Sequence, residues 1–175
     1  MLIHSQSGAF VWPIADARPG LVKAIVAVEP SGPPVHDVVF KGAPNYFEDG
    51  PLTKPWGITA VPLAYDGIAN ASQLAFAEQE KPDSPDLVKC WRQKEPARQL
   101  TNLHNIPVVI ISSEASYHAP YDHCTAQYLA QAGVKNDFIR LASRGIRGNG
   151  HMMMLEKNNL QIAAVIAEWL GNTLH

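Results

Sequence analysis

Runs of apolar residues and amphipathic stretches alternate along most of this chain. Two runs are nearly continuous and rich in β-branched residues, as expected for strands buried on both faces of a parallel sheet. Other stretches repeat their apolar residues at helical spacing, the last with a stripe formed by Ile162, Ile166, Trp169 and Leu170. The pattern predicts strands at residues 21–28, 106–112 and 138–141, and helices at residues 7–17, 122–132 and about 158–174. This alternation predicts a single α/β domain over residues 1–175, with a parallel sheet and right-handed crossovers.

Residues 31–103 interrupt the alternation. The part from residue 31 to about residue 55 is rich in proline and glycine, which favours an irregular lid or a segment that lines the substrate site. Residues 56–65 carry the pattern of a short strand, and residues 69–103 carry weaker helical patterns broken by Lys81-Pro82-Asp83-Ser84-Pro85. We therefore expect residues 31–103 to form a lid-like or cap-like insertion with a small helical part.

Composition and charge exclude some classes of partner. The chain has 175 residues, 46% of them hydrophobic, which is enough for one domain with a sizeable core. Its net charge of −2, without clusters of lysine and arginine, argues against nucleic-acid and membrane-surface partners. No apolar run reaches the roughly 18 residues of a transmembrane helix, and the N-terminus lacks the pattern of a signal peptide. The compartment stays unknown, and a homo-oligomer stays open.

The two cysteines, Cys90 and Cys124, could form a disulfide or stay free. They are too few for a disulfide scaffold, and they do not form a CxxC motif. Four residues of metal-ligand type fall within a short span: His118, Asp122, His123 and Cys124. Their spacing matches no common zinc motif, and neighbouring residues on a helix point to different sides. We therefore predict no metal and no cofactor.

A candidate nucleophile lies at the start of the chain, in the segment Ile3-His4-Ser5-Gln6-Ser7-Gly8. In a nucleophile elbow the serine sits on a tight strand-to-helix turn, so the residues two before and two after it should be small. Ser7 meets the second requirement, but Ile3 does not meet the first. Ser5 could also be an ordinary helix cap. If Ser5 is the nucleophile, the N–H of Gln6 supplies one donor of the oxyanion hole.

A serine nucleophile needs a general base, and an imidazole base needs a carboxylate that fixes its tautomer. His151 suits the role of base, because it follows the flexible loop Gly148-Asn149-Gly150 and precedes the last predicted helix. Two carboxylates compete for the role of acid. Glu29 ends the strand after the elbow helix, Glu114 follows the next clear strand, and spacing does not decide between them. Asp122 is a weaker third candidate, because an acid in the first turn of a helix favours the helix dipole without a catalytic role.

Four motifs carry a resemblance to a known family: His4-Ser5-Gln6-Ser7-Gly8, Val28-Glu29-Pro30, Glu114-Ala115-Ser116-Tyr117-His118 and Gly148-Asn149-Gly150-His151-Met152-Met153. With them the chain resembles a bacterial and fungal carboxylesterase-like subgroup of the α/β-hydrolases that uses a Ser-His-Glu triad. The resemblance implies Ser5 as nucleophile, Glu29 as acid and His151 as base. It covers essentially the whole chain but only the C-terminal part of the family's parallel sheet, so we expect the strands before the elbow to be missing.

These motifs predict a serine hydrolase that acts through an acyl-enzyme on a small-molecule carboxylic ester or a similar acyl compound. Three aromatic residues are candidates for the walls of the acyl pocket, or for plain core residues: Tyr46, Phe47 and Trp56. The second oxyanion donor of this fold comes from a loop after an early strand, and the chain offers no such loop. An inactive hydrolase fragment and a hydrolase-fold binding protein are therefore the alternative functions.

Overall fold

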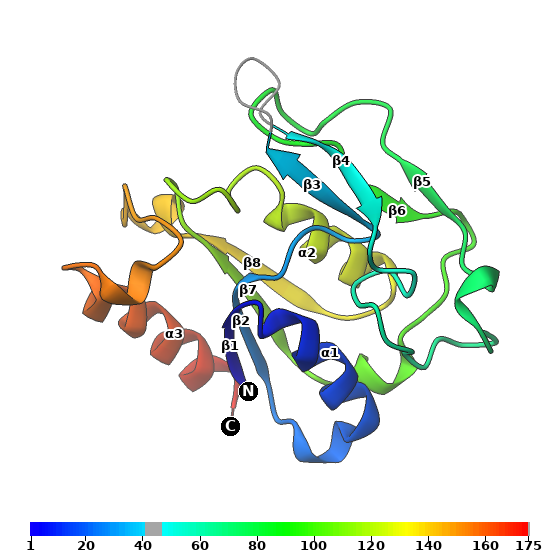
Figure 1. Cartoon of the computed structure of the whole chain (residues 1–175). Coiled ribbons are helices and arrows are strands. Elements are labelled where there is room, and N and C mark those ends of the chain that lie inside the picture. The colour runs from blue at the N-terminus through cyan, green and yellow to red at the C-terminus, as the bar shows by residue number, and fades with distance from the viewer. Residues whose placement is uncertain (41–46, 175) are drawn as a thin grey trace.

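The centre of the molecule is a four-stranded parallel sheet (Figure 1). The computed structural model describes residues 1–40 and 47–174, without the side chains of residues 39–40 and 47–49. The strands are β1 (Leu2–Ser5), β2 (Ile25–Pro30), β7 (Val108–Ser112) and β8 (Asn136–Arg140), and they lie in the order β1-β2-β7-β8. Every neighbouring pair is parallel. The predicted α/β class with a parallel sheet is thereby confirmed.

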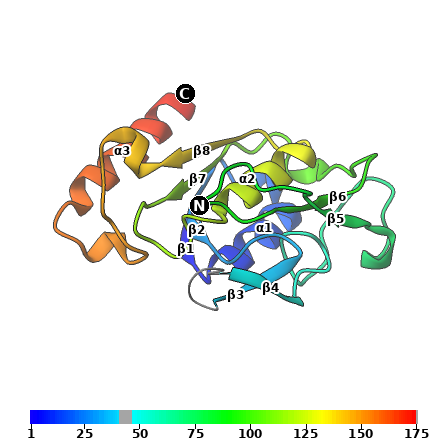
Figure 2. The same cartoon turned by 90° about the horizontal axis from the view of Figure 1, so that it is seen from above.

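Helices cover both faces of this sheet (Figure 2). α1 (Gly8–Ala17) and α2 (Asp122–Gln131) pack on one face, where they share a core cluster with Ile25, Ala27 and Ile110. α3 (Asn159–Thr173) packs on the other face, against the alternate residues of β2 and β7. In the predicted stripe of α3, Ile162 is buried and the other three residues are partly buried. Burial on both faces explains why β2 and β7 read as continuous apolar runs.

The boundaries of two strands differ from their predictions. β2 begins at Ile25 rather than at residue 21, because Pro19–Leu21 form a 3-10 turn (η1) after α1 and the side chain of Leu21 is exposed. The same strand continues through Pro30, which pairs with Ser5 at the edge of the sheet. β8 spans Asn136–Arg140, two residues earlier than predicted at its start.

The prediction of a small helical part within residues 31–103 was wrong, since the described part of this segment contains no α-helix. Its regular elements are two antiparallel pairs and two short 3-10 turns: β3 (His36–Phe40) with β4 (Phe47–Leu52), β5 (Phe76–Glu78) with β6 (Trp91–Gln93), η2 (Ala71–Gln73) and η3 (Thr101–Leu103). The described residues between 31 and 55 are therefore less irregular than expected. In place of the strand expected at residues 56–65 there is one isolated bridge, between Tyr65 and Leu100.

The residues of this segment do not form a core of their own. Ile58, Leu63, Tyr65, Leu74 and Leu100 are buried in the same cluster as the inner faces of α1 and α2. Three-residue strands are stable here because they pack on that cluster, which the local sequence pattern does not reveal.

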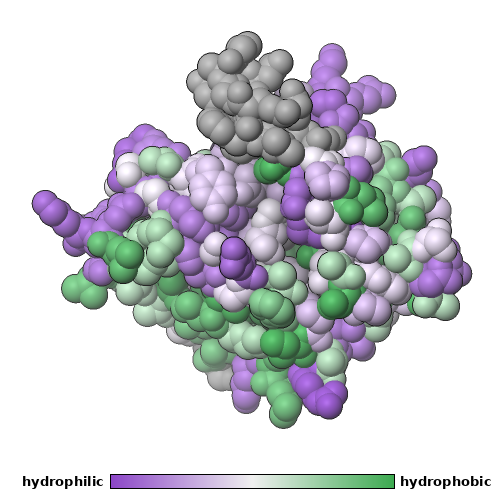
Figure 3. Space-filling view, viewed as in Figure 1, coloured by the Kyte–Doolittle hydropathy of each residue, from purple (hydrophilic) through white to green (hydrophobic). Residues whose placement is uncertain are grey.

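Apolar side chains gather on the lower part of one face of the molecule (Figure 3). Leu2, Phe10, Ile14 and Leu21 are among the exposed large hydrophobic residues, and they come from β1, α1 and η1. β1 has a strand neighbour on one side only within the described sheet. No helix in residues 1–40 and 47–174 is long and apolar enough to cross a membrane.

Later in the chain, η4 (Leu141–Arg144) follows β8, and η5 (Met153–Leu155) precedes α3. The residues between these two turns form the loop that carries His151.

Candidate active site

Ser5 lies on a strained turn between β1 and α1. Its φ of 56° falls in the left-handed region, which non-glycine residues rarely adopt. The Ser7 hydroxyl donates to the His4 carbonyl at 2.6 Å and accepts from the His4 N–H at 3.0 Å, so it braces the turn. A Cβ atom on Gly8 would lie 2.6 Å from the Ser31 nitrogen, which explains why glycine stands where α1 approaches the end of β2.

Ile3, at the position where a small residue was expected, is buried in the core between β1 and α1. Its partner in the β1–β2 register is Ala27, whose small side chain leaves room for the isoleucine. The local packing therefore accommodates this departure from the elbow pattern.

Ser5, His151 and Glu29 form a continuous hydrogen-bonded chain. The Ser5 Oγ atom is 2.8 Å from His151 Nε2, and His151 Nδ1 is 2.6 Å from Glu29 Oε2. Since a carboxylate only accepts, the proton of the neutral ring lies on Nδ1, and Nε2 is free to accept from the serine hydroxyl. Ser5 comes from the N-terminal strand, Glu29 from an inner strand of the sheet and His151 from the loop before the last helix. These distant segments thus meet at the carboxyl edge of the sheet.

The Glu29 carboxylate is fully buried and fully hydrogen-bonded. Its Oε1 atom accepts from the Ser113 N–H at 2.8 Å and from the Ser113 hydroxyl at 2.6 Å. Its Oε2 atom accepts from the Ser116 hydroxyl at 2.7 Å, besides His151. Both serines lie in the turn after β7, and sequence reasoning gave neither of them a role. The position of Ser113 directly after a buried strand was the available signal.

The remaining predicted site residues lie apart from this chain of contacts. The Glu114 carboxylate binds the Arg147 side chain at 2.9 Å and the Gly148 N–H at 3.0 Å, rather than His151. Gln6 is exposed in the turn between β1 and α1, and within the described residues no acceptor contacts its N–H. Trp56 packs at the margin of the main core. Tyr46 and the side chain of Phe47 lie outside the described part of the chain.

No protein-family model matches the chain. Over 172 residues, or 97% of its length, the chain is 46% identical to a probable secreted lipase, phiG, of a fungal species (strain ATCC 74256). The chain is therefore similar to this lipase over nearly its whole length. A solved structure of a bacterial esterase shares its fold, with a TM-score of 0.53 and 23% identity over 99% of the chain. The chain spans 45% of the lipase and 38% of the esterase, less than half of each.

Aromatic rings surround the imidazole of His151. The ring centroids of His4, Tyr117 and His118 lie 4.5, 4.8 and 4.7 Å from that of His151. The His4 Nε2 atom is also 2.9 Å from the His151 carbonyl oxygen. The hydroxyl of the half-exposed Tyr117 interacts with Ser5. Partial burial is the main cause that raises the pKa of Tyr117. Sequence reasoning had assigned none of these three rings to the site.

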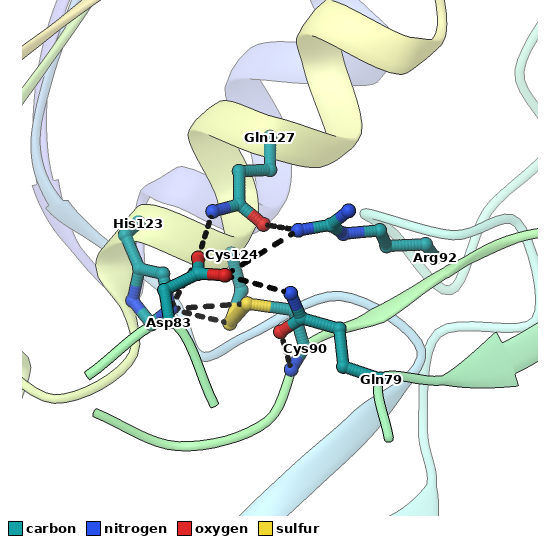
Figure 4. Close-up of a disulfide and its surroundings, with 7 residues drawn as sticks. All are labelled: Gln79, Asp83, Cys90, Arg92, His123, Cys124 and Gln127. Carbon is teal, nitrogen blue, oxygen red and sulfur yellow. Dashed lines mark hydrogen bonds and ion pairs between the residues drawn. A yellow bond between two sulfur atoms is a disulfide. The ribbon is translucent and has the colours of Figure 1, made fainter. Parts of the chain in front are cut away.

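The suspected group of metal-ligand residues separates into two pairs. His118 and Asp122 face the site, whereas His123 and Cys124 face the insertion, because consecutive helix residues point in different directions. Cys124 is bonded to Cys90, and the His123 Nε2 atom lies 3.2 Å from the Cys90 sulfur (Figure 4).

Polar side chains enclose this disulfide. The Gln127 side chain forms hydrogen bonds with both Asp83 and Arg92 (Figure 4). The Cys90 N–H donates a hydrogen bond to the Gln79 side chain. His123 and the two cysteine sulfurs lie close enough together to be metal ligands, but the sulfurs are bonded to each other. The disulfide therefore ties the segment before β6 to the first turn of α2, two positions after Asp122.

Proposed function

We propose that this chain carries the nucleophile, base and acid of a serine hydrolase that cleaves carboxylic esters. The observation that supports this best is the unbroken hydrogen-bonded chain from Ser5 through His151 to Glu29. Glu29 rather than Glu114 is the proposed acid, because its carboxylate contacts the His151 ring.

In the proposed reaction, Ser5 Oγ attacks the ester carbonyl while His151 Nε2 takes the serine proton. His151 then donates this proton to the departing alcohol, and an acyl-enzyme remains on Ser5. Water, deprotonated by His151, then attacks the acyl group. As the bond to Ser5 Oγ breaks, His151 returns the proton to that oxygen and the acid is released. Glu29 holds the ring in the required tautomer throughout.

The developing oxyanion would receive the Gln6 N–H and the positive end of the α1 dipole, since both lie directly after Ser5. Loss of one oxyanion donor typically costs on the order of 100- to 1,000-fold in turnover. We expect the Gln6 N–H to contribute a factor of this size to turnover.

We also infer that the insertion borders the acyl pocket. It begins at the same edge of the sheet as Ser5, where the Ser31 N–H donates to the Ser5 carbonyl at 3.0 Å. If Trp56 lines that pocket, Trp56→Ala should raise KM more for long-chain than for short-chain nitrophenyl esters. An equal change across the series would remove Trp56 from the pocket.

A fluorophosphonate probe tests the central proposal, because it reacts with an activated serine. The wild-type chain should be labelled and should hydrolyse a nitrophenyl ester, and Ser5→Ala should lose both properties. Labelling that persists in Ser5→Ala would overturn the assignment of Ser5.

An inactive hydrolase-fold unit is the alternative function. A correctly folded chain that neither reacts with the probe nor hydrolyses esters would support this alternative.

A further inference from the structure

A second histidine–carboxylate pair lies against the candidate base. His118 Nδ1 is 2.8 Å from Asp122 Oδ1, and the two side chains are 3% and 0% exposed. The His118 ring is parallel to that of His151, with a 6° angle between planes and 4.7 Å between centroids. We propose that the His118–Asp122 pair is a positioning element that keeps the His151 ring facing Ser5 and presents it with an uncharged surface. This inference rests on the proposed function.

The position of the His118 ring is determined by the turn that also holds Glu29. The His118 N–H donates to the Ser116 hydroxyl at 3.1 Å, and the same hydroxyl donates to Glu29 at 2.7 Å. The His118 carbonyl accepts from the N–H groups of Tyr121 and Asp122 at the start of α2. One turn therefore places two contacts of His151, the carboxylate at its edge and the ring on its face.

Burial keeps the pair without net charge. It lowers the pKa of His118 to about 4, and burial together with the nearby Glu29 raises the pKa of Asp122 well above its ordinary value. The Oδ2 atom of Asp122 has no hydrogen-bond partner among the described residues, so an ionised Asp122 would be poorly stabilised. A protonated His118 parallel to His151 would repel the imidazolium that forms during the reaction.

The titratable groups around the pair come from several elements. Glu29 faces it from β2, His4 from β1, and His151 from the loop before α3, with Tyr117 and Tyr121 from its own segment. Glu29 is the acidic residue of this set, and it contacts His151 directly. An uncharged His118–Asp122 pair leaves the attraction between Glu29 and a protonated His151 undisturbed.

Two substitutions of His118 separate positioning from simple packing. His118→Gln removes the flat ring, so kcat should fall on the order of 100-fold through misplacement of His151, while KM stays nearly unchanged. His118→Phe restores a flat ring and should recover most of kcat. Asp122→Asn, the isostere of a protonated aspartic acid, should keep the wild-type pH profile of kcat/KM.

The matched control is His123→Gln. His123 is also a buried histidine at the start of α2, but it contacts the disulfide instead of His151. This variant should lower the thermal midpoint without changing kcat or the pH profile. All variants are compared in the full 175-residue chain.

A low-field NMR signal from the His151 Nδ1 proton reports the ring position without turnover. The signal, assigned by its loss in His151→Gln, should be present in the wild type and in His118→Phe, and lost in His118→Gln. A wild type with the signal but without ester hydrolysis would refute the proposed function and leave the positioning testable.

Several results would overturn the positioning role. They are an unchanged kcat and NMR signal in folded His118→Gln, equal losses in His118→Phe and His118→Gln, or a shifted pH profile in Asp122→Asn. If His118→Gln does not fold, the other two variants decide: both should fold, and loss of kcat in either refutes the proposal. Failure of all three to fold would show that the pair serves stability instead.

Discussion

Replacement of Glu29 by glutamine should force His151 into the wrong tautomer. The Ser113 N–H donates to Oε1 at 2.8 Å, and a main-chain N–H cannot become an acceptor. The carbonyl oxygen of glutamine must therefore take the Oε1 position, which turns its NH₂ group towards His151 Nδ1. Two N–H groups would then face each other, so the ring would move its proton to Nε2. In that form His151 cannot accept the proton of Ser5.

A tautomer change of this kind typically lowers kcat on the order of 10,000-fold in serine hydrolases. At 1.36 kcal/mol for each tenfold change, this corresponds to about 5 kcal/mol of activation free energy. KM should change little, because Glu29 is fully buried and cannot touch the substrate. The assay is steady-state hydrolysis of a nitrophenyl ester, with the thermal midpoint measured as a check on folding.

Glu114→Gln is the matched control, because that carboxylate binds Arg147 and Gly148 at the surface. Its kcat should stay within about twofold of the wild type, since exposed ion pairs contribute little. A folded Glu29→Gln variant within about tenfold of the wild type, or a larger loss in Glu114→Gln, would refute the reasoning.

Two further predictions concern stability. Cys90 and Cys124 are 34 positions apart, so replacing both by alanine should lower the free energy of unfolding by about 4 kcal/mol in a urea titration. A loss below about 1 kcal/mol would contradict the loop-entropy account. Burial lowers the pKa of His123 from 6.5 to about 4, so the unfolded chain binds more protons and stability is lost as the pH falls through this window. The loss between pH 7 and pH 5 should be smaller in His123→Phe, and an unchanged loss would contradict the prediction.

The sequence by itself determined the elements whose apolar pattern is long and regular. β2, β7 and the three helices could be predicted from the sequence. An element that is buried on one or two faces needs apolar residues at a regular spacing, and this spacing can be read along the chain. The short strands β5 and β6 could not, because their stability comes from packing on α2 and the main core rather than from any local preference.

The same division holds in the site. The sequence offered Ser5 and His151 as candidates because an elbow pattern and a glycine-bearing loop are local features of the chain. Only the tertiary structure shows that Glu29 rather than Glu114 contacts His151, because parallel strands bring both residues to one edge of the sheet. The contacts of Ser113, Ser116, His118 and Asp122 depend on how the turn between β7 and α2 folds over the end of β2. The sequence determined which candidate groups are available for the chemistry, and the tertiary structure decided which of them lie in contact. The physical reason is that hydrogen bonds between distant segments produce no repeating pattern in the sequence.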